Sequence, residues 1–450
     1  MSITDLLAKY DRNVPRYTSY PTAPHFSPAI TGTHYAGWLA TLAGETPISL
    51  YLHVPFCASL CLFCACHTTV VHHTQPLISY GATLQTEIAR VATAIGRRLP
   101  VRHIHWGGGT PTALPPDTMR AVMTSLRRHF DVLPQAEIAV EVDPRTLSDS
   151  SLLALNEMGV TRASLGVQDF DPRVQRAIHR LQDYAVTSDC AVRLRFAGVR
   201  SLNLDLIYGL PYQTAAGVAD TLRQAQRIEP DRVAVFGYAH VPWMKKHQAL
   251  LPADALPGPA ERFAQRAMVD RMLTAAGYTA IGLDHFARPD DALAIAAANA
   301  RLKRNFQGYT TDDAAVLLGL GASSIGSLPQ GYVQNLPSVP AWRDAVRAGN
   351  LPVARGIALT SEDRLRRAVI ETLMCQNAVD LSAVAAQHGA DPASLMDAAP
   401  ALQMLQRDGL ISWDGMQVTV TAAGRPFVRA VAAAFDTWLE RGNGRHTAAV

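Results

Sequence analysis

The sequence lacks any apolar run close to the roughly 20 residues that a helix needs to cross a bilayer. Its first residues, MSITDLLAKYDRN, show no basic stretch followed by an apolar one, so no secretory signal is evident. Strong net charge is also absent, because 41 basic residues face 38 acidic ones and leave a charge of +3. Such a balance gives no global field that would attract nucleic acid. These absences predict a cytoplasmic chain that binds neither membrane nor nucleic acid.

Cysteine is scarce as well, with six residues in a chain of 450. Cys190 and Cys375 stand alone in apolar, helix-like surroundings and are predicted to be packed core residues. The other four lie together in one short loop, as Cys57, Cys61, Cys64 and Cys66. Thiols stay reduced in the cytoplasm, so this loop is predicted to bind metal or to react rather than to form disulfides.

The first three cysteines of this loop are spaced C-x3-C-x2-C. That spacing lets one short loop wrap three thiolates around a single iron–sulfur cube and leaves one iron with an open coordination position. A structural zinc site, the main alternative, usually joins two separated C-x2-C pairs. Only Cys61 and Cys64 have that spacing, and Cys64 and Cys66 are too close for both to bind one zinc comfortably. The loop therefore favours an iron–sulfur cluster, for which Cys66 is surplus.

Along the rest of the chain, short apolar runs alternate with amphipathic stretches from residue 47 onward, which predicts parallel βα units. Before that point we expect one short helix, at 34–42, and an ordered aromatic arm around PRYTSYPTA (15–23). The expected strands are 48–54, 102–108, 136–143, 162–168, 202–209 and 232–240, followed by a weaker one at 278–286. The expected helices are 77–98, 117–129, 149–158, 172–178, 184–197, 217–228 and 260–276.

Polar residues at the strand ends favour a barrel over a doubly wound sheet. The cysteine loop follows the first strand, and the GGGT stretch (107–110) follows the second. Glu141 and Asp143 close the third strand, Gln168 the fourth and Asp205 the fifth. Barrel enzymes build their sites at this rim from several strands, whereas a doubly wound sheet concentrates its ligand at one switch point. The pattern predicts an α/β fold, a parallel partial barrel.

The chain changes character after residue 360. Helices are expected at 362–375, 381–387 and 392–408, then two β-like runs around Asp414-Gly415 and a final helix at 423–441, which together resemble a winged-helix module. Residues 361–450 hold 8 arginines, no lysine and 10 acidic residues, so they offer no phosphate-binding face. We therefore expect an N-terminal arm (1–46), a β/α barrel (47–335) and a mainly helical domain (336–450) that covers the substrate site.

Glycines and carboxylates at the rim could hold a small zwitterion. The three residues 107–109 have no Cβ, so backbone groups there can approach a ligand directly. Glu141 and Asp205 lie among apolar neighbours and could accept hydrogen bonds from ribose hydroxyls or an ammonium group. The alternative for these carboxylates is a strand-end cap or an ion pair with Arg145 or Arg180.

A family resemblance is carried by motifs that span nearly the whole chain: RYTSYPTA, HVPFCASLCLFC, HWGGGTPT, EVDPRTL, LGVQDF, NLDLIYGLP, GYAHVP, DHFARPDD, RNFQGYTT and FDTWL. The chain resembles the oxygen-independent coproporphyrinogen III oxidases, which are radical S-adenosylmethionine (SAM) enzymes of haem biosynthesis. C-x3-C-x2-C alone indicates only the wider superfamily, whereas the arm, the fourth cysteine and the later motifs indicate this member.

The resemblance implies specific roles for residues of this chain. Cys57, Cys61 and Cys64 would hold a 4Fe–4S cluster, whose open iron would chelate SAM. The residues implied to contact the first SAM are Tyr51, Gly108, Glu141 and Ile325. Those implied to line a second SAM site are Phe63, Gly109, Thr110, Gln168, Arg180, Asp205 and Ala239.

The reaction implied by the resemblance is the loss of CO2 from two propionates of coproporphyrinogen III, which become vinyls and give protoporphyrinogen IX. Abstracting an unactivated C–H hydrogen needs a radical that only the cofactor can supply. A reductant such as flavodoxin or ferredoxin is the expected protein partner, and the chain is expected to be a monomer. Arg16, Arg288, Lys303 and Arg304 are hypothesised to bind the propionates, with surface ion pairs as the alternative.

One departure from the family pattern concerns Ala65 and His67, because relatives have Gly between the third and fourth cysteines. Ala restricts the backbone more than Gly does, which puts the role of Cys66 in doubt rather than the cluster. Two other functions were weighed. A haem-binding chaperone of the same superfamily would generally lack the arm and Cys66, and a zinc-stabilised regulatory protein is disfavoured by the missing basic face.

Overall fold

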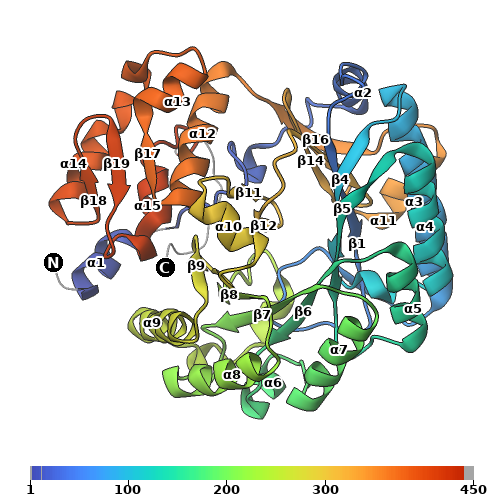
Figure 1. Cartoon of the computed structure of the whole chain (residues 1–450), viewed down its shortest axis with the longest axis horizontal. Coiled ribbons are helices and arrows are strands. Elements are labelled where there is room, and N and C mark those ends of the chain that lie inside the picture. Colours follow the sequence, from blue (N-terminus) through green and yellow to red (C-terminus); the bar gives the residue numbers. More distant parts are fainter. Residues whose placement is uncertain (1–2, 12, 440–450) are drawn as a thin grey trace.

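Seven neighbouring strands of the protein run parallel and form the wall around which everything else is arranged (Figure 1). The computed structural model describes residues 3–11 and 13–439. The order of the strands across the wall is β13 (Val316–Leu320), β1 (Ile48–Val54), β4 (Pro100–Gly108), β5 (Asp131–Val142), β6 (Arg162–Gln168), β7 (Ser201–Tyr208) and β8 (Arg232–Gly237). Because they are parallel, their carboxyl ends meet at one rim, where the expected site residues follow them.

Amphipathic helices pack on the outside of this wall, as the sequence predicted to within a few residues at each end (Figure 1). They are α3 (Thr74–Ile95), α4 (Pro116–His129), α5 (Asp149–Met158), α6 (Pro172–Ala177), α7 (Tyr184–Phe196), α8 (Ala215–Arg227) and α9 (Pro259–Ala275). Local signals set their ends. In α5 the Ser148 side chain accepts the Ser151 N–H, and Gly159 stops the helix with a φ of +79°.

The sheet stays open within the described residues, and both of its edges are antiparallel. At one edge β10 (His285–Ala287) and β9 (Thr279–Ile281) add antiparallel strands to β8. At the other edge β14 (Ile325–Leu328), β15 (Gly331–Asn335) and β16 (Val353–Ala358) extend the sheet from β13. The partial barrel is confirmed. The expected single strand at 278–286 is wrong, because Gly282, with a φ of +56°, turns the chain between β9 and β10.

Shorter elements complete the barrel. The pair β2 (Phe56–Cys57) and β3 (Thr69–Val70) closes the base of the cysteine loop, and the hairpin β11 (Lys303–Asn305) and β12 (Gly308–Thr310) lies against the rim. Two further helices, α10 (Ala292–Ala298) and α11 (Val339–Arg347), precede the C-terminal part. In the described part of the chain, no helix combines the length and the apolar character needed to cross a membrane.

The C-terminal part has its own core, built from three helices, a small sheet and a last short helix. These are α12 (Ser361–Gln376), α13 (Leu381–Gln387), α14 (Ala399–Arg407), β17 (Ala378–Asp380), β18 (Ile411–Trp413), β19 (Gln417–Val420) and α15 (Val428–Ala433). The expected helix at 392–408 is divided, because a 3-10 helix covers Pro392–Ala398 before α14 begins. The expected final helix at 423–441 is wrong in length: α15 ends at Ala433, and its last expected residues, 440 and 441, lie outside the described part.

The N-terminal arm joins this C-terminal core. Helix α1 (Ile3–Tyr10) was not expected from the sequence, although Leu6, Leu7 and Tyr10 bury one face of it against that core. The Tyr17 hydroxyl donates to Asp436 at 3.0 Å, and the Tyr20 hydroxyl lies 3.2 Å from the Thr437 hydroxyl. These contacts hold the segment after α15 in a non-helical conformation. Helix α2 (Gly32–Ala40) then leads to the barrel, close to its expected place.

Candidate functional site

The cysteine loop, residues 57–66, begins at the carboxyl end of β1 and faces a cavity of about 360 Å³ at the rim of the barrel, here called the rim cavity. Cys57, Cys61 and Cys64 all line it. Hydrogen-bond donors surround two of the sulfur atoms. Cys57 Sγ accepts from Thr68 Oγ1 at 3.1 Å and from Thr110 Oγ1 at 3.6 Å. Cys61 Sγ accepts from guanidinium groups, Arg180 Nη1 at 3.5 Å and Arg145 Nη2 at 3.8 Å.

Such donors favour the thiolate form, which is the form that binds metal, and at Cys57 they oppose the burial that raises the pKa of this thiol. The third sulfur has a donor of its own, because a hydrogen bond from the Cys66 side chain lowers the pKa of Cys64 to about 7. The backbone N–H of Cys66 also points to Cys64 Sγ, at 3.4 Å. Cys66 itself is exposed. This arrangement suits Cys64 as a ligand and Cys66 as its neighbour.

Within residues 3–11 and 13–439, no group of three or more His, Cys, Asp or Glu side chains is placed to hold a single metal ion. Cys57, Cys61 and Cys64 reach one cavity from a single loop, and Cys66 lines the same cavity. A cluster spreads its thiolate ligands over several iron atoms, so three thiols around one cavity fit the cluster that their spacing predicts.

Residues of neighbouring segments form hydrogen bonds with the backbone of the cysteine loop. His247 Nε2 lies 2.7 Å from the Cys64 carbonyl oxygen, and Gln248 Nε2 donates to the Phe63 carbonyl at 2.8 Å. Lys245 Nζ donates to the Cys66 carbonyl at 2.8 Å. On the other side, the Leu62 N–H donates to the Ile178 carbonyl at 2.9 Å. These bonds fix the loop, so the thiols keep their directions without relying on a bound group.

The glycine run after β4 leaves room for Glu141. A Cβ at Gly107 would lie 2.6 Å from Glu141 Oε1, and one at Gly109 would lie 2.6 Å from the Phe56 carbonyl oxygen. Gly108 has a φ of +119°, and its N–H donates to Glu141 Oε2 at 3.0 Å. Side chains at these positions would therefore displace the carboxylate or strain the turn.

Glu141 is held as a carboxylate. Burial opposes its charge, but the hydrogen bond from His105, at 3.1 Å, and the N–H of Gly108 outweigh this, and its pKa lies below the usual value. Tyr51 lies beneath this pair, with its ring stacked on His105 and its hydroxyl 3.0 Å from His53 Nδ1. An ionised carboxylate can accept hydrogen bonds from an ammonium or a hydroxyl.

The sequence left open whether Glu141 or Asp205 forms an ion pair with Arg145 or Arg180. In the structure, these two arginines pair with Asp143 instead. Asp143 accepts from Arg145 Nη2 at 2.6 Å and from Arg180 Nη2 at 3.2 Å. Arg180 is nearly fully buried, and its Nε has no hydrogen-bond partner among the described residues. A buried donor without a partner is costly, so this group is ready to bind a ligand oxygen.

Asp205 lies deeper in the rim cavity, where it accepts from Ser164 Oγ at 2.7 Å and from Asn203 Nδ2 at 2.8 Å. Burial raises the pKa of Asp205 and the charge of Glu141 raises it further, whereas the bonds from Ser164 and Asn203 oppose this rise. Gln168, at the end of β6, has a φ of +70° and is also buried. Both residues therefore present polar groups to a water-poor space.

The rim cavity brings together most of the residues that the resemblance implied. Besides the three cysteines, it is lined by Phe63, Gly108, Gly109, Thr110, Glu141, Gln168, Arg180 and Asp205. Tyr51, Ala239 and Ile325 do not line it. Tyr51 lies beneath the glycine run, Ile325 begins β14 beside Tyr332, and Ala239 faces a different cavity near α9.

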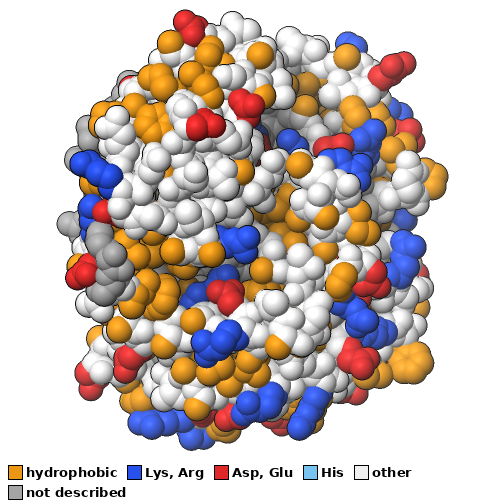
Figure 2. Space-filling model, turned by 60° about the vertical axis from the view of Figure 1, so that its left-hand side comes forward, with side chains coloured by type: hydrophobic (Ala, Val, Ile, Leu, Met, Phe, Trp, Pro, Cys, Tyr) orange, Lys and Arg blue, Asp and Glu red, His pale blue; other side chains and the backbone are white. Residues whose placement is uncertain are grey.

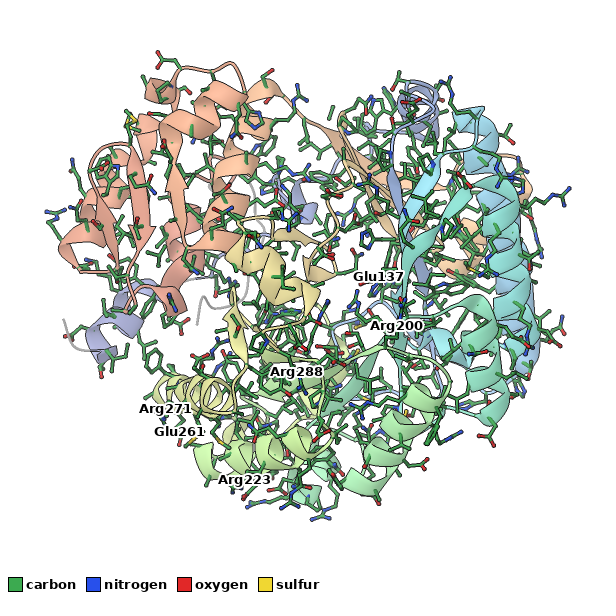
Figure 3. All side chains as sticks on the ribbon, viewed as in Figure 1. Glu137, Arg200, Arg223, Glu261, Arg271 and Arg288 are labelled. Carbon is green, nitrogen blue, oxygen red and sulfur yellow. The ribbon has the colours of Figure 1, made fainter. Side chains whose placement is uncertain are left out.

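Other polar residues of this cavity were missed in the sequence. Ser164, Asn203, His103 and His105 line it, and Glu137, labelled in Figure 3, lies toward the amino ends of the strands, where it pairs with Arg162. A signal was available, because in each strand these residues stand two or four positions before the rim residue. Side chains two apart share one face of a strand, so a polar stripe inside the barrel could have been read from the sequence.

Known proteins are similar to this chain over nearly its whole length. Residues 51–225 match the Radical SAM superfamily, and residues 359–427 match the HemN C-terminal domain. The oxygen-independent coproporphyrinogen III oxidase of Bradyrhizobium diazoefficiens is 50% identical over 99% of both chains, and that of Paracoccus denitrificans is 42% identical over 99% of this chain and 98% of its own. The solved structure of coproporphyrinogen III oxidase (HemN) from Escherichia coli, described as a radical SAM enzyme, is 39% identical. It covers 95% of this chain and 100% of its own, with a TM-score of 0.90.

Proposed function

This chain belongs to the oxygen-independent coproporphyrinogen III oxidases of the radical SAM superfamily, and we propose which of its residues perform the reaction. It is an oxidoreductase that converts two propionates of coproporphyrinogen III to vinyls with a 4Fe–4S cluster and SAM. The observation that carries the residue assignment is the convergence of three thiols and the Glu141–Gly108 pair on one cavity.

Cys57, Cys61 and Cys64 hold the cluster in this proposal. A cluster held there would supply the electron that cleaves SAM, and SAM would supply the radical chemistry that no side chain can provide. The residues of the chain prepare for this with donors on Cys57 and Cys61 and with a backbone that other segments hold in place. Cys66 orients Cys64 and is not a ligand.

The methionine part of SAM binds between the glycine run and Glu141. The carboxylate of Glu141 accepts from the ammonium group, and Gly108 offers backbone groups without a Cβ in the way. Tyr51 supports His105, which in turn holds Glu141. Ile325 completes this contact set from β14 in the proposal.

A second SAM is proposed along the opposite wall of the same cavity. The residues proposed to contact it all line the rim cavity: Phe63, Gly109, Thr110, Gln168, Arg180 and Asp205. The unpartnered Nε of Arg180 supports a carboxylate contact there. Ala239 belongs to this set only by the family pattern, because its side faces another cavity.

Radical chemistry requires exclusion of water, and electrons must still reach the cluster. The arm and the C-terminal domain, which share one core, are proposed to cover the substrate over the rim. The electron donor is proposed to be a flavodoxin or a ferredoxin. A monomer in the cytoplasm is the proposed state of the enzyme.

An anaerobic assay with coproporphyrinogen III, SAM and a reductant tests this function. We expect protoporphyrinogen IX and 5′-deoxyadenosine, with methionine as the co-product. Formation of 5′-deoxyadenosine without protoporphyrinogen would leave the radical chemistry standing and contradict the substrate. The E141Q variant should keep its iron and lose at least tenfold in apparent SAM affinity, because the charged acceptor is gone.

A further inference from the structure

A second cavity, of about 480 Å³, lies where the end of β8, helix α9 and the C-terminal domain meet. We call it the arginine cavity, because arginines of three different segments line it: Arg16 of the arm, Arg262 and Arg266 of α9, and Arg425 and Arg429 of the C-terminal domain. Its only acidic lining residues among those described are Asp270 and Asp284. Figure 2 shows Lys or Arg side chains together with an acidic one inside a hollow of the surface.

Two of these arginines converge on one strand end. Arg16 Nη2 donates to the Gly237 carbonyl at 2.8 Å. A Cβ at Gly237 would lie 3.3 Å from Arg262 Nη2 and 2.9 Å from the Tyr208 hydroxyl. The space that lets Arg262 approach this strand end exists because residue 237 has no side chain.

The acids of this cavity are already engaged elsewhere. Asp270 forms a bidentate pair with Arg266, with Nη2 to Oδ1 at 2.8 Å, and Asp284 lies 2.7 Å from His285 Nδ1. Among the described residues, neither Arg16 nor Arg262 has a carboxylate within ion-pair distance. Half-buried guanidinium groups without a direct ion pair favour an anionic ligand.

The electrostatics of the neighbours agree with an excess of positive charge. Arg429 is buried, and this burial, followed by repulsion from Arg16, lowers its pKa to about 9. Its Nε donates to the Pro15 carbonyl at 3.0 Å, which fixes the arm beside it. The pKa of Asp284 is held far below its usual range, because the bond from His285 and the charges of Arg304 and Arg16 outweigh its burial.

We propose that the arginine cavity binds a carboxylate of the tetrapyrrole substrate, with Arg16 and Arg262 as the two guanidinium groups that take it. This inference rests on the proposed function, which supplies a substrate with four propionates. Guanidinium groups present paired N–H donors that match a carboxylate, and two of them on either side of one strand end can hold it in a fixed direction. One propionate held here would leave others free to reach the rim.

The proposal chooses among the candidates for propionate binding. It keeps Arg16 and adds Arg262, for which the helix position alone gave no signal. Arg288, labelled in Figure 3, is exposed and lies 3.8 Å from Asp290, so it is not part of this cavity. Lys303 and Arg304 line a neighbouring cavity, and Arg304 donates to the Arg16 carbonyl at 3.1 Å, which makes it a support for the arm.

The test is a fluorescence titration of the anaerobically reconstituted protein with coproporphyrin III, the oxidised and fluorescent form of the substrate, and with its tetramethyl ester. We expect R262Q and R16Q each to weaken coproporphyrin III binding about tenfold or more, because each loses a charge-assisted hydrogen bond. The ester should bind the wild type and R262Q equally. R271Q is the matched control, because Arg271 is an exposed residue of the same helix (Figure 3).

Unchanged coproporphyrin III affinity in R262Q, or an equal loss in R262Q and R271Q, would overturn the proposal. An equal loss of affinity for coproporphyrin III and for its tetramethyl ester in R262Q would also overturn the proposal. Such a result would show that the substitution changes the shape of the cavity rather than its recognition of a carboxylate. R262K should recover part of the affinity and guards against misfolding of R262Q. If the wild type binds through Arg262 but makes no protoporphyrinogen, the carboxylate site stands and the proposed reaction fails.

Discussion

At the scale of single residues, we propose that the cysteine loop divides its four thiols into three ligands and one neighbour. Cys57 and Cys61 receive donors from outside the loop, whereas Cys64 receives its donor from Cys66. The spacing of the first three cysteines was sufficient to predict a cluster, but the role of Cys66 depended on the fold of the loop. Its exposure and its bond to Cys64 assign it to orientation.

The loop therefore predicts different outcomes for two neighbouring substitutions. C64S should lose most of the iron and the visible absorbance after anaerobic reconstitution, because a ligand is missing. C66S should keep both, with only a modest change in the pH dependence of reconstitution. The bound cluster is measured in both variants by the iron content and by the visible absorbance that dithionite bleaches. A C66S protein as colourless as C64S would show that Cys66 is a ligand.

At the scale of elements, one buried carboxylate joins three parts of the barrel. Glu87 of α3 accepts from the Gly321 N–H at 2.7 Å, from Asn335 Nδ2 at 2.5 Å and from Trp342 Nε1 at 3.0 Å. The partners lie after β13, at the end of β15 and in α11. This network fastens the first helix of the barrel to the far edge of the sheet.

Because of Glu87, we expect the free energy of unfolding to depend on pH. Burial raises its pKa to about 7, although its three hydrogen bonds oppose this. Its folded pKa is above the unfolded value, so the folded state binds more protons between about pH 4.5 and 7, and stability falls as pH rises through that window. The loss from this group is at most about 3 kcal/mol. The E87Q variant should show a smaller difference in melting temperature between pH 5.5 and pH 7.5 than the wild type does. An equal difference in both proteins would contradict this role of Glu87.

The elements also show what sequence could and could not predict. Helix α5 was predicted at its observed bounds, because Ser148 and Gly159 are local signals for its start and stop. The final helix was predicted too long, because contacts of the arm with Asp436 and Thr437 override its local pattern. The network of Glu87 could not be predicted, since its partners are 234 to 255 residues away in the chain.

The same distinction holds for the site. Rim residues such as Glu141 were found because the carboxyl ends of parallel strands must meet. The arginine cavity, which Ala239 and Arg262 line, could not be predicted, because it forms only when the arm and the C-terminal domain come together. A site made by distant segments leaves no short motif in the sequence.

At the scale of the whole molecule, the first part of the arm belongs to the C-terminal core rather than to the barrel. Leu6, Leu7, Tyr10, Tyr17 and Tyr20 all pack in that core, whereas Tyr35 and Leu39 of the later part pack in the barrel. Segments from the two ends of the chain therefore pack against each other beside the barrel (Figure 1). The cover that we propose over the rim depends on both.

This arrangement predicts that Tyr20 stabilises the C-terminal domain. Tyr20 is almost fully buried, so Y20A should cost about 3–5 kcal/mol and expose the domain to limited proteolysis, while the barrel stays resistant. Y20F keeps the ring and loses the bonds with Thr437, so its cost should be about 1 kcal/mol. Proteolysis followed by mass spectrometry separates the two domains. Equal resistance of Y20A and the wild type would show that the arm only rests on the surface.

The contact between Tyr20 and Thr437 also fixes an order of events during synthesis. The two residues are 417 positions apart, and ribosomes add about 5–20 residues per second. The arm leaves the ribosome first and must wait tens of seconds for its partner. By the time Thr437 is made, the cysteine loop and every strand of the barrel sheet have already been synthesised, so the joining of the arm to the C-terminal domain comes after the barrel sequence is complete.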